Sequence, residues 1–204
     1  MSNLLLSLYD HSGNASRPYK EAGWKVVQVD IKNGIDILTW DYKDPYGGLK
    51  NHDKIGIIIM QPCTCYALCG NRHKINRLNN GEFEQSQLLV EHSRRIVEYF
   101  NPFFWQLENP KTDIHKKNEW IGQRPKFIFD PCDFAGYDPE PDNSRYNKET
   151  WLFGKFNDPA RKRIEPLQKQ FPGHTNLGGK SERTKELRSI TPLGFAYAFY
   201  ESNH

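Results

Sequence analysis

The amino-acid sequence predicts an α/β protein whose centre is a doubly wound, mostly parallel sheet. Two observations support this prediction: short aliphatic runs recur through the first half of the chain, and segments with helical spacing alternate with them. Such an alternation favours parallel strands joined by crossover helices that cover both faces of the sheet. In open sheets of this kind, ligands bind at the carboxyl ends of the strands.

The predicted elements follow one another in order. We expect strands over residues 4–9, 25–29, 55–60 and 103–107, with helices over residues 17–22 and 82–99. The second helix is expected to pack on the sheet through one face, because five of its residues recur at intervals of three or four. These residues are Leu88, Leu89, His92, Ile96 and Tyr99.

The second half of the chain is irregular. Between residues 110 and 155 it is rich in Pro, Asp and aromatic residues, which interrupt regular structure. We expect a single domain over residues 1–204 with a small insert at about 112–147. A strand over residues 150–153 and a helix over 192–202 are predicted to follow, and Gly194, Ala196 and Ala198 would let that helix pack closely.

Length and composition exclude several classes of protein. The 204 residues can bury one sizeable core. No apolar run approaches the ~20 residues that span a bilayer, and the start does not read as a signal peptide. We therefore expect a cytoplasmic protein with no membrane partner. Its four cysteines should be reduced, and its net charge of +3 is too small to indicate nucleic-acid binding by itself.

Two strand ends carry the residues with reactive side chains. The run over residues 55–60 leads into Pro62-Cys63, and the run over 103–107 ends in Glu108-Asn109-Pro110. The pair predicts a thiol nucleophile beside a carboxyl group.

Other interpretations of these residues stay open. Cys63 is alternatively a buried structural thiol, since cysteine is among the most buried residue types. A zinc cluster of Cys63, Cys65, Cys69 and Cys132 with His73 is a further alternative, although this spacing departs from the usual paired Cys-x-x-Cys. Glu108 taken alone is as consistent with a surface or helix-capping carboxylate.

The order and chemistry of these segments resemble the DNA (cytosine-5)-methyltransferases. In that family the nucleophile lies in a Pro-Cys loop and the catalytic glutamate opens a Glu-Asn-Val segment. Residues 7–14, Ser-Leu-Tyr-Asp-His-Ser-Gly-Asn, stand where the family has Asp-Leu-Phe-x-Gly-x-Gly-Gly, and residues 188–192 are similar to its late Arg-x-Leu-Thr-Pro motif. Small phage and prophage members look closest, which implies modification of DNA against host restriction. The resemblance covers most of the chain and implies a Rossmann-like S-adenosylmethionine-dependent methyltransferase fold.

The resemblance also implies a mechanism. The Cys63 thiolate would add to carbon 6 of cytosine, and a protonated Glu108 would stabilise the charge at ring nitrogen 3. The family's Arg-x-Arg pair, which holds the flipped cytosine, is not matched in place here. Lys148 or Arg145 is expected to substitute for it.

The cofactor implied by the resemblance is S-adenosyl-L-methionine. The turn after the first strand would face its amino-acid part, Asp30 would accept hydrogen bonds from the ribose, and Asp36 and Ile37 would meet the adenine. The expected cofactor-binding residues are Tyr9, Asp10, Gly13, Asn14, Asp30, Ile31, Asp36, Ile37 and Gln61.

DNA is the expected partner, but the chain has no room for a full target-recognition domain. Sequence specificity should therefore be low, with most of the affinity supplied by phosphate contacts. The expected DNA-binding residues are Arg145, Lys180, Arg183, Lys185 and Arg188. One alternative is a methyltransferase acting on a free pyrimidine nucleotide. Another is a catalytically inactive relic of the fold that binds DNA or a protein.

Overall fold

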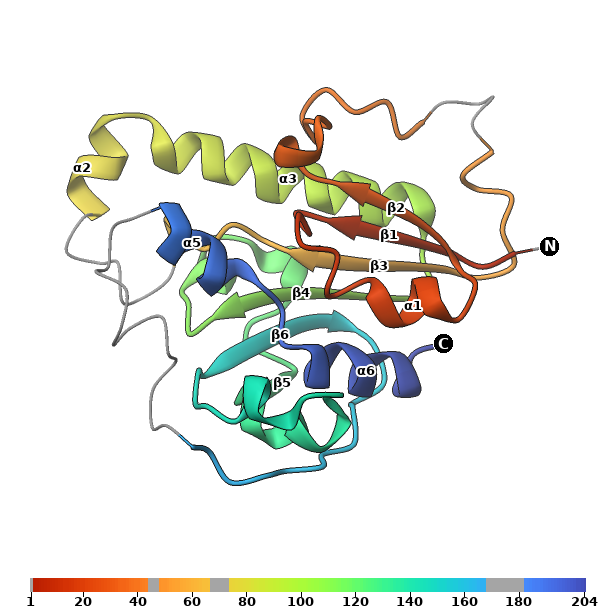
Figure 1. Ribbon diagram of the computed structural model, residues 1–204. Coiled ribbons are helices and arrows are strands. Elements are labelled where there is room, and N and C mark those ends of the chain that lie inside the picture. The colour runs from red at the N-terminus through yellow and green to blue at the C-terminus, as the bar shows by residue number, and fades with distance from the viewer. Residues whose placement is uncertain (1, 44–47, 67–73, 168–181) are drawn as a thin grey trace.

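A six-stranded sheet forms the centre of the fold (Figure 1). The computed structural model describes residues 2–43, 48–66, 74–167 and 182–204. The strand order is β2-β1-β3-β4-β6-β5. The strand bounds are β1 Leu4–Leu8, β2 Lys25–Val29, β3 Ile55–Met60, β4 Phe104–Pro110, β5 Phe127–Phe129 and β6 Thr150–Lys155.

The sheet is mixed but mostly parallel. β1 pairs in parallel with β2 and β3, and β3 pairs in parallel with β4. β6 runs antiparallel to β4 and to β5, which closes the edge of the sheet. The predicted α/β class with a doubly wound, mostly parallel sheet is confirmed at this level, and the topology is compatible with a Rossmann-like fold.

The strands form because aliphatic residues fill both faces of the sheet. All five residues of β1 are buried, as are five of the six in β3. Gly56 is required where β3 passes β4, because a Cβ atom there would lie 2.2 Å from the ring of Phe104. β2 and β3 have the predicted bounds, whereas β4 begins one residue later than expected and continues through Pro110.

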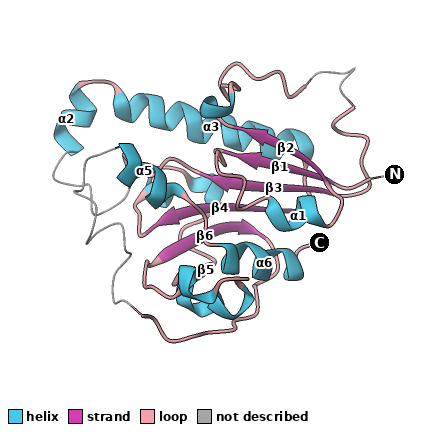
Figure 2. Cartoon of the chain, in the orientation of Figure 1, coloured by secondary structure: helices cyan, strands magenta, loops and turns pink. Residues whose placement is uncertain are grey.

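Helices cover both faces of the sheet (Figure 2). α3, Glu82–Phe100, packs against one face through a core that includes Leu6, Ile57 and Leu107. α1, Arg17–Glu21, and α6, Leu193–Ser202, cover the other face through a core that includes Tyr19 and Phe199. Within the described ranges, the structure also contains α2 Lys74–Asn79 and α5 Glu182–Ser189, which were not predicted.

The predicted face of α3 was wrong in part. Leu88 is 53% exposed, and the helix buries a stripe in which two serines stand among apolar side chains. The buried residues are Ser86, Val90, Ser93, Ile96, Val97 and Phe100. Ser86 and Ser93 interrupt the apolar pattern in the sequence, which explains why the periodicity pointed to a neighbouring face.

The irregular segment after β4 packs on the sheet. It contains 3-10 turns, of which η5, Pro131–Tyr137, contacts α6, and it contributes β5 to the edge of the sheet. The expected close packing of α6 is confirmed, since a Cβ atom on Gly194 would lie 2.3 Å from the carbonyl oxygen of Phe134. In the part of the chain described, no helix is both long and apolar enough to cross a bilayer.

Candidate active site

The topology places a ligand site between β1 and β3. The chain runs from β1 outward to β2 and then returns across β1 to β3, so the strand order reverses at this point. In open α/β sheets the crevice beyond the carboxyl ends at such a reversal is the usual ligand site. β1 to β4 all point to the same end of the sheet in Figure 1, where α2 and α5 also lie.

The Cys63 loop follows β3 and is tied to the segment after β4 at both of its ends. Asn109 Nδ2 donates to the carbonyl oxygen of Gln61 at 3.1 Å, two residues before the cysteine. Three residues after it, the carbonyl of Tyr66 accepts hydrogen bonds from Thr112 Oγ1 and the Asp113 amide, both at 3.2 Å. These bonds fix the loop relative to β4, and they leave Cys63 partly exposed.

The other cysteines belong to different surroundings. The Cys65 thiol lies 3.5 Å from the carbonyl oxygen of Glu82 at the start of α3. Cys132 is fully buried in η5 and donates to Asn147 Oδ1 at 3.3 Å. Cys69 and His73 of the alternative zinc cluster lie outside the described residues. Within the described ranges, no group of three or more His, Cys, Asp or Glu side chains is arranged to hold a metal.

Glu108 lies inside β4, not after it as predicted. Its residue pairs in register with Met60, the last residue of β3, so the carboxyl group and the Cys63 loop occupy adjacent strand ends. Burial raises the pKa of the Glu108 carboxyl above its usual range, and the Lys148 ammonium opposes part of that rise. This environment favours the protonated form that an acid at a ring nitrogen requires.

Lys148 is held at three points beside Glu108. Its Nζ atom donates to the carbonyl oxygen of Arg188 at 3.0 Å, and its own carbonyl accepts from Thr150 Oγ1 at 2.7 Å. Its backbone amide donates to the Asp130 carboxylate. A lysine anchored in this way presents its charge from a defined position.

Arg145, the other expected substitute for the family's arginines, is directed elsewhere. Its guanidinium donates to Asp142 Oδ1 and to the carbonyl oxygen of Glu165, both at 2.9 Å. Of the two candidates, Lys148 is therefore the residue whose charge acts on Glu108.

The turn after β1 is organised around Asp10. Its carboxylate, 2% exposed, accepts hydrogen bonds from the hydroxyls of Ser7 and Ser16 at 2.8 and 2.9 Å and from the Gly13 amide at 2.9 Å. These hydrogen bonds to the buried Asp10 carboxylate hold the conformation of the turn. Gly13 has a φ of +72°, a left-handed conformation that favours glycine.

The late motif returns to this turn. Asn14 Nδ2 donates to the carbonyl oxygen of Thr191 at 3.2 Å, and the Thr191 hydroxyl lies 3.4 Å from the sulfur of Met60. Residues 188–191 therefore contact the turn after β1, the end of β3 and, through Arg188, the Lys148 ammonium. Segments 177 residues apart in sequence meet at the carboxyl ends of β1 and β3.

The end of β2 presents one acidic and one apolar side chain. Asp30 Oδ1 accepts a hydrogen bond from the Lys32 amide at 2.8 Å, and the neighbouring Ile31 is 74% exposed. Ile37 is 4% exposed and belongs to the core, while Asp36 Oδ1 accepts from the Leu38 amide at 3.0 Å. Ile31 is thus a more accessible surface for a planar ring than Ile37.

A cluster of hydrogen-bonded polar side chains joins the ends of β1 and β3 to α3. The Tyr9 hydroxyl donates to the carbonyl oxygen of Leu89 at 3.0 Å and lies 3.2 Å from Ser93 Oγ, which donates to Gln61 Oε1 at 3.3 Å. Sequence reasoning included Tyr9 and Gln61 but missed Ser93. Its only signal is a polar residue within a helix stripe that is otherwise largely apolar.

The expected DNA-binding residues are only partly described. Lys180 lies outside the described ranges, and so do the side chains of Arg183 and Lys185. On the same helix, Glu186 Oε1 forms an ion pair with Lys32 Nζ at 2.9 Å, which ties α5 to the end of β2.

Comparison with models of known protein families matches no family, and comparison with curated proteins finds no significantly similar relative.

Proposed function

We propose that the protein transfers a methyl group from S-adenosylmethionine to carbon 5 of cytosine in DNA. The observation that carries the proposal is the pairing of two strand ends: the Cys63 loop is hydrogen-bonded to the segment that follows Glu108. A thiol and a carboxyl group that favours its protonated form are the two groups that this reaction needs.

Each group has a distinct task. Carbon 5 of cytosine is too weakly nucleophilic to accept a methyl group directly. The Cys63 thiolate forms a bond to carbon 6 and displaces electron density toward carbon 5, while Glu108 donates a hydrogen bond or proton at nitrogen 3. After methylation the proton at carbon 5 passes to water, the bond between carbon 6 and the cysteine sulfur breaks, and the Cys63 thiolate is released. Lys148, held beside Glu108, would orient the base.

The end of β2 and the turn after β1 fit the implied cofactor. When bound, S-adenosylmethionine supplies an electrophilic methyl group. Asp30 offers a carboxylate for ribose hydroxyls and Ile31 an exposed apolar surface for a ring. Gln61, at the end of β3, joins this region to α3 through the hydrogen bond that its Oε1 atom accepts from Ser93.

The test is methyl transfer from radiolabelled S-adenosylmethionine, followed by bisulfite sequencing of plasmid DNA. We expect methylated cytosines that share at most one or two flanking bases. Cys63→Ser should abolish transfer while leaving cofactor affinity intact, and the matched control Cys65→Ser should retain activity. Equal transfer by Cys63→Ser and the wild type would overturn the proposal.

A second candidate is an enzyme that methylates a free cytosine nucleotide. It is favoured by the packing of the segment between β4 and β6, which contributes β5 to the sheet and contacts α6 through η5, so that this segment does not form a separate recognition unit. Rapid methylation of dCMP with no methylated plasmid cytosine would select this candidate. Failure to bind S-adenosylmethionine in a calorimetric titration would instead indicate a relic of the fold that is not an enzyme.

A further inference from the structure

We propose that residues 116–124 form the phosphate-binding surface through which this protein holds nucleic acid. The inference rests on the proposed function for its choice of polyanion, but its observations are independent of the catalytic residues. It deepens that proposal by assigning the backbone contacts to one segment of the chain.

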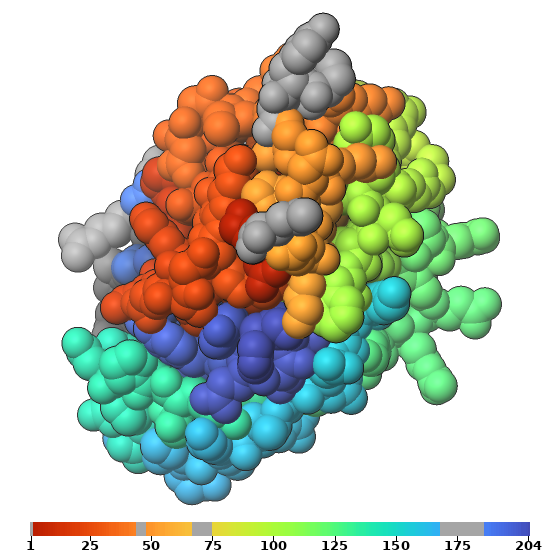
Figure 3. Space-filling model, turned by 90° about the vertical axis from the view of Figure 1, so that its right-hand side faces the viewer, coloured from red at the N-terminus to blue at the C-terminus, as the bar shows by residue number. Residues whose placement is uncertain are grey.

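The segment after β4 concentrates positive charge. Residues 111–126 carry five Lys or Arg residues and two acidic ones. Asp113 is partly buried at the Cys63 loop, where its amide donates to Tyr66, so Glu119 is the exposed carboxylate of the segment. Figure 3 shows several long side chains of this green segment standing out from the surface.

Three of these cations are exposed within a stretch of nine residues. Lys116, Lys117 and Arg124 are exposed, and no carboxylate of the described chain lies within ion-pair distance of them. By contrast, most arginines in the described part of the chain pair with a neighbouring carboxylate. Examples are the pairs Arg17–Glu21, Arg94–Glu91, Arg145–Asp142 and Arg163–Asp133, at 2.6 to 2.9 Å. Unneutralised cations close together on one segment create the field that attracts a polyanion.

The segment is rigidly supported. Trp120 lies between the cations in sequence and stacks on Trp105 of β4, with ring centroids 5.1 Å apart. Ile114 and Ile121 are buried in the core on the α3 face. The cations therefore project from an ordered platform, which lowers the entropy lost when they bind phosphates.

The residues just before the platform are hydrogen-bonded to the catalytic loop. Thr112 and Asp113 donate the hydrogen bonds that hold the carbonyl of Tyr66, three residues from Cys63. The platform then runs back along the α3 face of the sheet, where Trp120 stacks on Trp105 near the start of β4. A DNA strand bound across residues 116–124 would therefore lie along this face and reach the nucleophile past Thr112 and Asp113.

The test compares two double variants of equal charge change. Lys116→Gln with Lys117→Gln removes two cations of the platform. Lys20→Gln with Lys25→Gln removes two exposed lysines from α1 and β2, neither of which forms an ion pair with a carboxylate of the described residues. Binding of a fluorescein-labelled 20-base-pair duplex is followed by anisotropy from 50 to 200 mM salt.

The platform variant should bind the duplex about tenfold more weakly at 0.1 M salt, and its log–log salt slope should fall by nearly 2, about 0.9 per lost phosphate contact. The control variant should behave as the wild type. Equal losses in both variants, or no loss in the platform variant, would overturn the inference. If the wild type binds no duplex yet methylates dCMP, the phosphate surface is wrong while the cysteine chemistry stands. If it binds duplex with the predicted slope but transfers no methyl group, the reverse holds.

Discussion

Glu108 and Lys148 lie close enough for the charge of one to act on the protonation of the other. Burial raises the pKa of the Glu108 carboxyl, and the Lys148 ammonium lowers it in part. A carboxyl group whose pKa is raised in the folded state stays protonated to higher pH than in the unfolded chain. Its contribution to stability is therefore present at low pH and is lost as pH rises through the folded pKa.

Replacing Lys148 with Met should raise the pKa of Glu108 further. The limb of the activity profile that falls with rising pH should then move to higher pH, because the protonated acid persists longer. Loss of a charged hydrogen bond should also lower kcat/KM by about 10- to 100-fold. The measurement is kcat/KM against pH. Lys155→Met, which removes an exposed lysine at the far end of β6, is the control. An unshifted limb in Lys148→Met would separate Lys148 from the acid.

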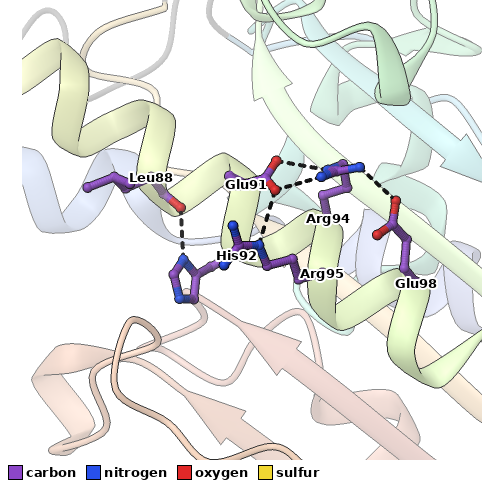
Figure 4. Close-up of polar contacts among 6 residues, drawn as sticks. All are labelled: Leu88, Glu91, His92, Arg94, Arg95 and Glu98. Atoms are coloured by element: carbon purple, nitrogen blue, oxygen red, sulfur yellow. Dashed lines mark hydrogen bonds and ion pairs between the residues drawn. The ribbon is translucent and has the colours of Figure 1, made fainter.

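At the scale of single elements, the sequence pattern predicted the bounds of α3 better than it predicted which face of that helix is buried. The bounds of α3 were predicted almost to the residue, but Ser86 and Ser93 hid its buried stripe. The exposed face is organised instead by ion pairs (Figure 4). Glu91 accepts from Arg94 at 2.6 Å and from Arg95 at 3.1 Å. These pairs lower the pKa of Glu91 to about 2.

The Glu91 pairs should make a small, pH-dependent contribution to stability. Exposed helix pairs at this spacing contribute about 0.3–0.5 kcal/mol each. Because the folded pKa is lowered, the contribution is present above the ordinary glutamate pKa and disappears as pH falls toward about 2. Urea unfolding at pH 7 should show Glu91→Gln less stable than Glu98→Gln, which loses only one partner, Arg94. Equal stabilities, or a difference that survives high salt, would contradict this assignment.

α6 depends on a glycine for its approach to η5. In an exposed helix, Gly→Ala ordinarily stabilises, but here the added Cβ atom meets the carbonyl oxygen of Phe134 at 2.3 Å and its carbon at 3.0 Å. We expect Gly194→Ala to lower the free energy of unfolding by about 1–3 kcal/mol, as overpacking does elsewhere. Thermal unfolding measures the change, and a stabilised variant would show that the helix can move away from η5.

For the whole molecule, the local sequence pattern predicted the strands that are buried along their length. It did not predict the direction of a strand that is set by pairing with a distant segment. The aliphatic runs of β1 and β3 are bounded by turn residues and were predicted closely. The antiparallel direction of β6 depends on its contact with β4. The two strands approach so closely there that a Cβ atom on Gly154 would lie 2.3 Å from the carbonyl oxygen of Trp105. The sequence around Gly154 contains no pattern that indicates this contact.

The candidate site divides in the same way. Cys63 and Glu108 were identified because each follows or ends a recognisable strand, and the structure brings those strand ends together. Other features could not be predicted because they depend on the folded chain. The buried Asp10 carboxylate accepts hydrogen bonds within its own turn, and Ser93 of α3 donates to Gln61 after β3. The contact between Asn14 and Thr191 joins residues 177 positions apart, which a local pattern cannot predict.

The measurement that tests the central claim most directly is covalent trapping on DNA that contains 5-fluorocytosine. Fluorine at carbon 5 cannot leave as the proton does, so the adduct between the thiol and carbon 6 persists after methyl transfer. With S-adenosylmethionine present, we expect a denaturation-resistant complex whose peptide map places the nucleotide on Cys63, at full yield in Cys65→Ser and absent in Cys63→Ser. A complex that survives in Cys63→Ser, or no complex with a wild type that methylates cytosine, would contradict the account.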